Sequence, residues 1–467
     1  MSKALITTIF ISLIIESVFS KHIVLNFRTN IDLNSLTEEN YMSSTIEQQI
    51  YVDLKIGESK QTIPMTLKSM KYPTFIVSSN STEEDILIKY DESKSKNSLK
   101  YLYENEIKNL FIYDFTQGYY VSDTLGFSSS NTYNNFSYIL ATKMNGIVKN
   151  ISGEIGFSKN LENKANYIYP QKTNFIEQLY NNQLISKKIF GIKYDTEYEG
   201  RLILGATLDE IDSSYKPEEQ IKNEIDNDVP NNNKNDWLIK FNVNFKKNQD
   251  EEFNEKSYGF LQFEFGLIIG SNNYYQNFIL NYFETKQCTK NTIKSSSHSF
   301  YQYTCNNENQ FNDFPDLNLS GENKYNFTFT KNDLFKKVGN KYFFLIVFQI
   351  SQININYWRL GQLFFRKYPT FLSNDEEGKN GQFSYYSINK QGGDQPQTDE
   401  TDGPKSDDGE NVGLTVALSI LIPLIIIAAV LIFIYYYRKR NKQIKSEALL
   451  KDSPTGSNDD SYPIIDN

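Results

Sequence analysis

The sequence predicts an all-β ectodomain with two lobes, followed by one transmembrane helix. Apolar and polar residues alternate repeatedly through 22–388, as they do in half-buried β-strands. The chain has 467 residues, of which 39% are hydrophobic, so it is long enough for two lobes and their tails. A predominantly apolar, charge-free run covers 412–434 and is long enough to cross a bilayer.

Composition argues against several classes of function. The net charge of −9 is spread along the chain without a basic stripe, which argues against nucleic-acid binding. The chain has two histidines, His22 and His298, so a zinc site with several histidine ligands is not expected. A Ser-His-Asp triad would depend on His298, which lies in a soft polar run. Nucleotide-binding glycine loops, Gly-X-Ser-X-Gly and Cys-X-X-Cys are all missing from the sequence, and we expect no metal or other cofactor.

The ends of the chain carry targeting signals. A lysine, a short apolar run and small residues in 1–20 predict a cleaved secretory signal, because the run is too short for a membrane anchor. An acidic stalk covers 391–411 and precedes the membrane span 412–434. Basic residues after the span place the tail, 435–467, in the cytosol. Together these segments predict a single-pass type I membrane protein of the secretory or endolysosomal pathway or the cell surface.

One stretch, 51–79, organises the ectodomain. Apolar residues alternate in YVDLKI (51–56), GESK (57–60) makes a turn, and the alternation resumes in QTIPMTLK (61–68). This stretch resembles the opening of pepsin-like aspartic proteases, in which a strand, a turn and a second strand lead to the catalytic Asp-Thr-Gly-Ser loop. The match runs without a gap from Gly57 to Ser78, and it places Lys68 at the position of the first catalytic aspartate.

Three later segments extend this resemblance over roughly 51–388. The segment FIYDFTQG (111–118) is similar to the family's flap hairpin, with Phe111 or Tyr113 at the flap tyrosine position, although the glycine-rich tip is missing. A short helix within 175–185 and the strand GRLILG (200–205) follow in the family's order. Near the end, WRLGQLFFRKYPTF (358–371) resembles the family's closing motif.

The second active-site loop should lie within FLQFEFGLIIGS (260–271). With the family's apolar pair placed on Leu267 and Ile268, the second aspartate becomes Gln262. A register shift brings Phe263 or Glu264 to that position instead. Glu264 is the one acid of this loop, and no aspartate occurs between Asp250 and Asp313. The resemblance therefore implies a pepsin-like fold in which both catalytic motifs are degenerate.

Without the two aspartates the family's chemistry is not expected. Aspartic proteases activate water between two carboxylates that share a proton, one acting as base and the other as acid. A charged lysine cannot accept a proton and glutamine does not titrate. The leading hypothesis is therefore an inactive protein that binds peptide or protein in the cleft between its lobes. An active aspartic endopeptidase with a non-standard pair of acids, and a type I sorting receptor, remain as alternatives.

Modification sites fit a secreted ectodomain. The two cysteines can form one bridge in an oxidising lumen, and the resemblance implies that Cys288 pairs with Cys305. Sequons for N-glycosylation occur at five positions, which are Asn80, Asn135, Asn150, Asn318 and Asn326. In the tail, Tyr462 and Ile465 form a Tyr-X-X-hydrophobic motif that a clathrin adaptor could bind as an extended segment.

The predicted organisation follows from these segments. A lead-in at 21–50 precedes an N-terminal lobe at 51–215. A polar loop at 216–236 then connects this lobe to a C-terminal lobe at 237–390.

Overall fold

The computed structural model describes most of residues 21–386. The described residues are 21–31, 35–69, 73–81, 86, 88–97, 99–102, 107–108, 115–127, 132–144, 151–158, 174–225, 237–246, 252–295, 298–321, 325–350, 357–374 and 381–386. The predicted signal, stalk, membrane span and tail lie outside these residues. So do Phe111, Tyr113, Asn150, Tyr462 and Ile465.

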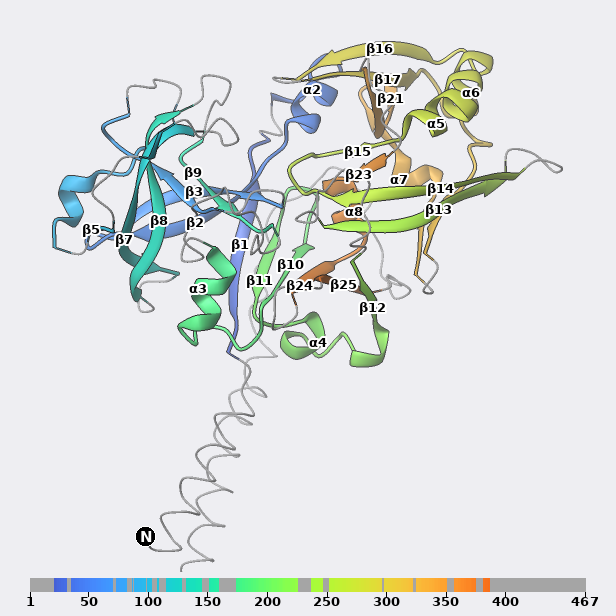
Figure 1. Cartoon of the computed structure of the whole chain (residues 1–467). Helices are drawn as coiled ribbons and strands as arrows, with labels where there is room; N and C mark the ends of the chain where they lie inside the picture. The colour runs from blue at the N-terminus through green and yellow to red at the C-terminus, as the bar shows by residue number, and fades with distance from the viewer. Residues whose placement is uncertain are drawn as a thin grey trace, which may run out of the picture. The chain divides into compact units, whose positions relative to one another are not determined.

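Two β-sheets form the described ectodomain, which confirms the all-β prediction (Figure 1). The first sheet runs through thirteen neighbouring strands, with β6 (Ile107–Lys108) paired to β7 beside this path. In sheet order these strands are β12 (Gln220–Glu224), β25 (Gly381–Tyr386), β24 (Thr370–Asn374), β10 (Ile189–Tyr194), β11 (Glu199–Leu204), β1 (Ile23–Thr29), β2 (Ile50–Ile56), β3 (Gln61–Lys68), β9 (Gly153–Gly156), β4 (Phe75–Val77), β8 (Thr132–Met144), β7 (Phe115–Gly126) and β5 (Lys100–Tyr101).

The second sheet lies wholly in the C-terminal part of the chain. Its strands in sheet order are β19 (Asn326–Phe329), β18 (Leu317–Ser320), β13 (Leu238–Lys246), β14 (Glu252–Leu261), β23 (Tyr357–Leu360), β15 (Ile268–Ile269), β22 (Ile346–Gln349), β17 (Ser299–Cys305), β21 (Lys341–Phe344) and β20 (Phe335–Val338), and β16 (Thr289–Lys294) pairs with β17. The disulfide predicted between Cys288 and Cys305 is present and joins the ends of the β16–β17 hairpin.

Helices in the described residues are short. They are α2 (Tyr41–Ile46), η2 (Glu92–Ser95), α3 (Phe175–Asn181), α4 (Leu208–Ile211), η4 (Pro217–Glu219), α5 (Asn272–Tyr274), the π-helical segment η5 (Tyr275–Ile279), α6 (Leu280–Thr285), η6 (Glu308–Gln310), α7 (Lys331–Leu334) and α8 (Gln362–Lys367). Within the part of the chain that the structure describes, no helix is long and apolar enough to span a membrane. The predicted span, 412–434, is not among those residues.

Local sequence explains the strand pair at the start of the N-terminal lobe. Strands β2 and β3 pair in antiparallel register, with Val52 opposite Met65 and Leu54 opposite Ile63. All four side chains are fully buried. The turn between the strands begins at Gly57, whose φ of 80° is a left-handed conformation that glycine adopts without strain. The predicted strand pair and turn are both confirmed, although residues 63–67 of β3 are buried on both faces of the sheet.

The same strand pattern occurs once in each lobe. In the N-terminal lobe β3 pairs parallel with β9, β9 pairs antiparallel with β4, and β4 pairs parallel with β8. In the C-terminal lobe β14 pairs parallel with β23, β23 pairs antiparallel with β15, and β15 pairs parallel with β22. The two lobes are therefore duplicates of one strand arrangement around the ends of β3 and β14.

The expectation of a polar loop at 216–236 is wrong for its first half. Residues 217–219 form η4, and 220–224 form β12, which pairs along its length with β25. The sequence of this segment is polar because β12 is the edge strand of its sheet. Most side chains of such a strand face solvent. Because β24 and β25 belong to the first sheet, the end of the predicted C-terminal lobe, 370–386, joins the sheet of the N-terminal lobe.

One hydrophobic core extends through both lobes. A single cluster of buried side chains includes Leu54 and Ile155 of the first sheet and Phe263 and Trp358 of the C-terminal lobe. Phe157 stacks on Phe190 with ring centroids 4.4 Å apart and lies 6.2 Å from Phe263. This continuous packing holds the ends of β3 and β14 in a fixed relation.

Polar contacts also connect the lobes. The indole N–H of Trp237 donates to the carbonyl of Phe157 over 2.7 Å, and the Gln362 side chain donates to the carbonyl of Gln48 over 2.8 Å. The hydroxyl of Tyr194 donates to Gln362 Oε1 over 2.8 Å. All of these groups lie close to the strand ends that form the candidate site.

Candidate functional site

The candidate site lies where β3 and β14 end. Lys68 is the last residue of β3, and Gln262 directly follows β14. In the register of the first sheet, Leu67 pairs with Ile155 and Lys68 pairs with Gly156. In the second sheet, Leu261 pairs with Leu360, the residue before Gly361.

The downstream strands give the same correspondence. Phe75, seven residues after Lys68, pairs with Glu154. Ile269, seven residues after Gln262, pairs with Arg359. Lys68 and Gln262 therefore occupy equivalent places in the duplicated lobes. By the same reasoning Glu154 corresponds to Arg359, since each precedes a glycine by two residues.

An ion pair forms at the first of these positions. The Lys68 Nζ lies 3.7 Å from a carboxylate oxygen of Glu154, and the two side chains are 16% and 2% exposed. A buried carboxylate is costly unless a cation or hydrogen-bond donors compensate it. Lys68 supplies a positive charge to that carboxylate, which differs from the role of an aspartate that shares a proton.

Gln262 fills the equivalent position on the other lobe. The residue is 3% exposed, and its backbone N–H donates to the carbonyl of Leu360 over 3.0 Å, extending the strand pairing by one step. Its side-chain oxygen is buried and accepts no hydrogen bond from the described residues. A buried amide oxygen in this state can accept a hydrogen bond from a bound group.

Glu264 connects the two loops. The hydroxyl of Ser69, the residue after Lys68, donates to the Glu264 carboxylate over 2.6 Å. Ser69 is fully buried, and Glu264 is partly exposed. The acid of the second loop therefore lies beside the end of the first loop, which brings the two loops together at the lobe junction.

An arginine packed against two aromatic rings lies next to this junction. The guanidinium carbon of Arg359 lies 5.4 Å from the ring centroid of Phe265 and 5.8 Å from that of Tyr357. Burial, and secondarily the charge of Arg359, lowers the pKa of His298 below its usual value. At neutral pH His298 is therefore mainly uncharged, which fits a partly buried imidazole near a guanidinium.

The structure adds residues to the site that sequence reasoning missed. Arg359 belongs to the segment 358–371, for which only a family resemblance was predicted, and no role was predicted for Glu154 or Ser69. A charged residue within an otherwise apolar strand, at the same place in both lobes, is the signal that could have identified the first two. The predicted flap residues Phe111 and Tyr113 lie outside the described residues. The described arms of that hairpin pair Ile107 with Gly118.

The sequons differ in their surroundings. Asn80, Asn135 and Asn326 are exposed, whereas Asn318 is partly exposed and accepts a hydrogen bond from the Thr328 hydroxyl. Asn80 donates to the Glu92 carboxylate. Exposed asparagines are the ones available for glycosylation.

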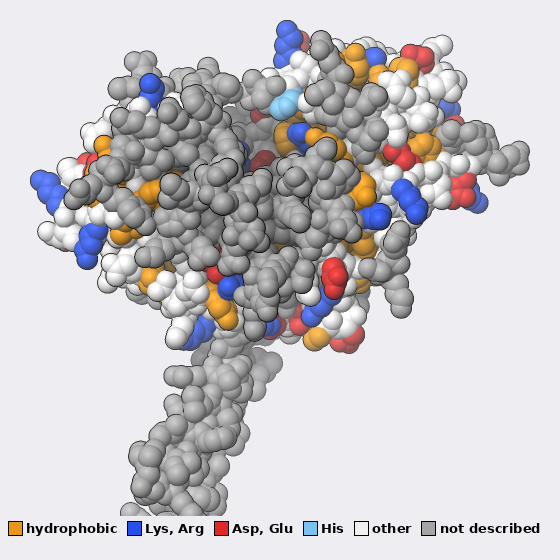
Figure 2. Space-filling view, viewed as in Figure 1, with side chains coloured by type: hydrophobic (Ala, Val, Ile, Leu, Met, Phe, Trp, Pro, Cys, Tyr) orange, Lys and Arg blue, Asp and Glu red, His pale blue; other side chains and the backbone are white. Residues whose placement is uncertain are grey.

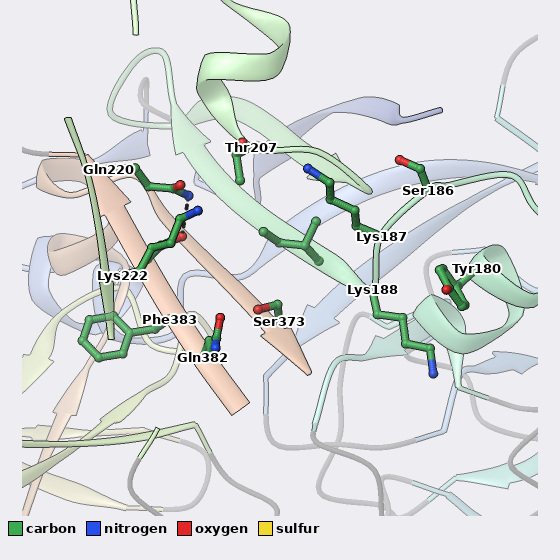
Figure 3. A pocket seen from close by; sticks show the side chains of 12 residues that line it. Tyr180, Ser186, Lys187, Lys188, Thr207, Gln220, Lys222, Ser373, Gln382 and Phe383 are labelled. Carbon is green, nitrogen blue, oxygen red and sulfur yellow. Dashed lines mark hydrogen bonds between the residues drawn. The ribbon is translucent and has the colours of Figure 1, made fainter. Parts of the chain in front are cut away.

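Two grooves lined by described residues lie apart from the junction. The larger, of about 570 Å³, lies beside β10, β24, β25 and β12 (Figure 3). Its lining includes Lys187, Lys188 and Lys222, which Figure 3 labels. The second, of about 380 Å³, lies between α2 and the β16–β17 hairpin. Neither groove is lined by Lys68 or Gln262.

Acids balance the lysines of the larger groove. Lys187 pairs with Glu210, and Lys188 lies 2.8 Å from Glu177. Burial alone would raise the pKa of Asp209, but hydrogen bonds from tyrosine and threonine hydroxyls and the charge of Lys222 lower it. Because each lysine has a nearby carboxylate, this groove has no marked excess of positive charge.

Among the described residues, no group of three or more His, Cys, Asp or Glu side chains is arranged to hold a metal ion. Comparison of the sequence with models of known protein families, and with curated proteins, found no match.

Proposed function

We propose that this chain is a membrane-anchored protein of pepsin-like architecture that has no proteolytic dyad and binds a peptide or protein segment between its lobes. The observation that carries the proposal is the equivalence of Lys68 and Gln262 in the duplicated strand arrangement. In a two-lobed aspartic protease these two places hold the catalytic carboxylates.

The architecture is supported from two directions. The strand pattern around β3 and β9 is repeated around β14 and β23, as expected for a protein with two related lobes. The sequence motifs at 57–78, 200–205 and 358–371 fall on strands, turns and a short helix in the order that the resemblance predicts. The signal, the stalk and the apolar run at 412–434 support a membrane anchor on sequence grounds.

The chemistry of the junction argues against water activation. A proton-sharing dyad needs two close carboxylates whose pKa values separate. Here one position holds an ammonium group 3.7 Å from Glu154, and the other holds an amide that does not titrate. The ammonium favours the ionised form of a nearby carboxylate, so a shared proton is disfavoured.

The same groups suit binding. Lys68 is partly exposed and can donate to a peptide carbonyl, and the unsatisfied oxygen of Gln262 can accept a backbone N–H if the Gln262 side chain turns toward the bound segment. Hydrogen bonds of this kind can bind an extended peptide segment without cleaving its peptide bonds. The junction therefore carries hydrogen-bonding side chains at the positions where the resemblance leads us to expect catalytic carboxylates.

An assay of the full chain, purified in detergent, tests the absence of proteolysis. The protein is incubated with a denatured protein substrate from about pH 3 to pH 7, with and without a transition-state inhibitor of aspartic proteases. We expect no cleavage that the inhibitor blocks. Inhibitor-sensitive cleavage that disappears in a Glu264→Gln variant would overturn the proposal and favour the active endopeptidase, because Glu264 is the acid beside Ser69.

Selection from a displayed library of random peptides tests binding. Peptides enriched on the full chain should lose affinity for a Lys68→Glu variant, since the reversal places a second acid beside Glu154. A Lys94→Glu variant is the matched control, because Lys94 is an exposed lysine with a neighbouring aspartate. Equal retention by both variants, or no enrichment at all, would contradict binding at the junction.

A further inference from the structure

One face of the second sheet carries cations and aromatic rings together. Lys240 of β13 pairs with Tyr258 of β14, Tyr258 pairs with Tyr357 of β23, and Phe260 of β14 pairs with Arg359 of β23. Directly paired residues point to the same side of a sheet. We call these five residues, together with Phe265, the basic–aromatic face.

Burial shows that most of this face is open to solvent. Lys240, Tyr258, Tyr357 and Arg359 are partly exposed, whereas Phe260 is 8% exposed. Residues that alternate with them, such as Ile239, Phe241 and Trp358, point to the other side and are buried in the core. The outer side of a sheet normally carries polar residues, so the aromatic side chains gathered here need a further reason.

Aromatic rings hold both cations. The Lys240 ammonium lies 6.0 Å from the ring centroid of Tyr258. The Arg359 guanidinium contacts Phe265 and Tyr357, and Tyr357 packs edge-on against Phe260 at 4.9 Å. A guanidinium held against rings loses less freedom when it binds a carboxylate with two parallel hydrogen bonds.

Neither cation forms an ion pair with a carboxylate of the described residues. This distinguishes them from the lysines of the larger groove, each of which has an acid nearby. Figure 2 shows blue basic and red acidic side chains interspersed over the visible surface, which fits the spread of charge along the sequence. Two unpaired cations on one face are therefore a local feature of a chain whose net charge is −9.

We propose that the basic–aromatic face binds an extended acidic peptide segment. Lys240 and Arg359 lie two strands and two residues apart, which corresponds to about 12 Å between their Cα atoms at usual strand spacings. At roughly 3.3 Å per residue, carboxylates three or four residues apart in an extended peptide match this separation. The rings between the cations offer apolar surface to the intervening side chains.

The position of the face gives the peptide a path to the lobe junction. Phe265 follows Glu264, whose carboxylate contacts Ser69 of the other lobe. The inference goes beyond the proposed function, because it concerns an outer face and holds whether or not the junction binds or cleaves peptides.

Fluorescence anisotropy of two labelled ten-residue peptides tests the inference. One carries glutamates four residues apart in a Val/Thr background, and the other carries glutamine at the same positions. We expect the full chain, in detergent and at low salt, to bind the glutamate peptide at least tenfold more tightly. We also expect raised salt to weaken this binding, since part of the face is exposed.

Variants locate the binding. Lys240→Gln and Arg359→Gln should each weaken binding of the glutamate peptide, the arginine variant by about tenfold. Lys337→Gln is the matched control, because Lys337 also lies over a tyrosine ring, 5.7 Å from the centroid of Tyr342, but on another surface. Unchanged thermal unfolding in all three variants shows that loss of binding is not loss of fold.

Three results would overturn the inference. The first is equal affinity for the glutamate and glutamine peptides. The second is an equal effect of Lys337→Gln and the two face variants. The third is that a heparin oligosaccharide binds through Lys240 and Arg359 while the glutamate peptide does not, since the face would then recognise a sulfated glycan.

Discussion

At the scale of residues, the junction is defined by how charges are compensated. Glu154 is almost fully buried, and the Lys68 ammonium lies 3.7 Å from its carboxylate. On the other lobe Gln262 corresponds to Lys68 and Arg359 corresponds to Glu154. A cation therefore stands where the first lobe has a carboxylate. A site built in this way keeps charges fixed rather than passing a proton between them.

Removing the ammonium should destabilise the protein. We expect Lys68→Met to lower the free energy of unfolding by about 2 kcal/mol, because it takes a cation away from a buried carboxylate. Urea unfolding followed by fluorescence measures the change. Lys94→Met removes an exposed lysine 3.2 Å from Asp91 and should change stability by less than about 0.5 kcal/mol. Equal effects of the two variants would show that the Lys68–Glu154 pair has no special role.

His298 should make stability depend on pH. Burial and the charge of Arg359 lower its pKa in the folded state, so the unfolded chain binds a proton at a higher pH. The contribution of neutral His298 to the free energy of unfolding is therefore fully present above the unfolded-state pKa of about 6.5. It is lost as the pH falls through the folded-state pKa.

NMR titration of the imidazole measures this shift. We expect a pKa below 6.5 in the wild-type chain and a higher pKa in Arg359→Met, with burial keeping part of the shift. A folded-state pKa at or above 6.5 would contradict this account.

At the scale of elements, a buried acid anchors the β2–β3 turn to β7. Asp123 is 1% exposed and accepts hydrogen bonds from the hydroxyls of Tyr90 and Ser95 and from the Thr124 amide. A Cβ added at Gly57 would lie 2.6 Å from the hydroxyl oxygens of both Tyr90 and Ser95. The glycine therefore lets this network pack directly beneath the turn.

Breaking the network should loosen the N-terminal lobe. We expect Tyr90→Phe to lower the free energy of unfolding by about 2 kcal/mol, because a buried carboxylate loses a hydrogen-bond donor. The urea midpoint measures the effect. Tyr101→Phe is the control, since Tyr101 is 53% exposed and should contribute little. An unchanged midpoint in Tyr90→Phe would mean that the network does not hold the turn.

At the scale of the whole molecule, the ectodomain is a duplicated strand arrangement joined through one core. Phe157, Phe190 and Phe263 bring the two sheets into contact beside the strand ends. Each lobe could not bury its own apolar face as completely alone, because these rings pack against one another.

The sequence anticipates the parts of this fold that follow local patterns. Alternation and a glycine turn predicted β2 and β3, and the family resemblance implied the disulfide partners. The edge strand β12 was missed because its sequence, QIKNE, is mostly polar. The Lys68–Glu154 pair was missed because its members come from strands that are distant along the chain. Long-range pairing of this kind is set by tertiary packing rather than by local propensity.

The membrane anchor remains a prediction from sequence. We expect the full chain to stay in the membrane pellet after extraction with alkaline carbonate, because a 23-residue apolar run at 412–434 can span the bilayer. A variant lacking 412–434 should appear in the soluble fraction. Release of the full chain by carbonate would contradict a membrane span.

The central claim is that Lys68 and Gln262 occupy equivalent places at two strand ends that meet at the lobe junction, where the resemblance leads us to expect two carboxylates. The most direct measurement is cross-linking of a Lys68→Cys, Gln262→Cys double variant with a short bifunctional thiol reagent. The described cysteines of the native chain are both in the disulfide, so the new thiols react alone. We predict an intramolecular cross-link in the double variant and none in either single variant. Free thiols that both react but never link would contradict the claim.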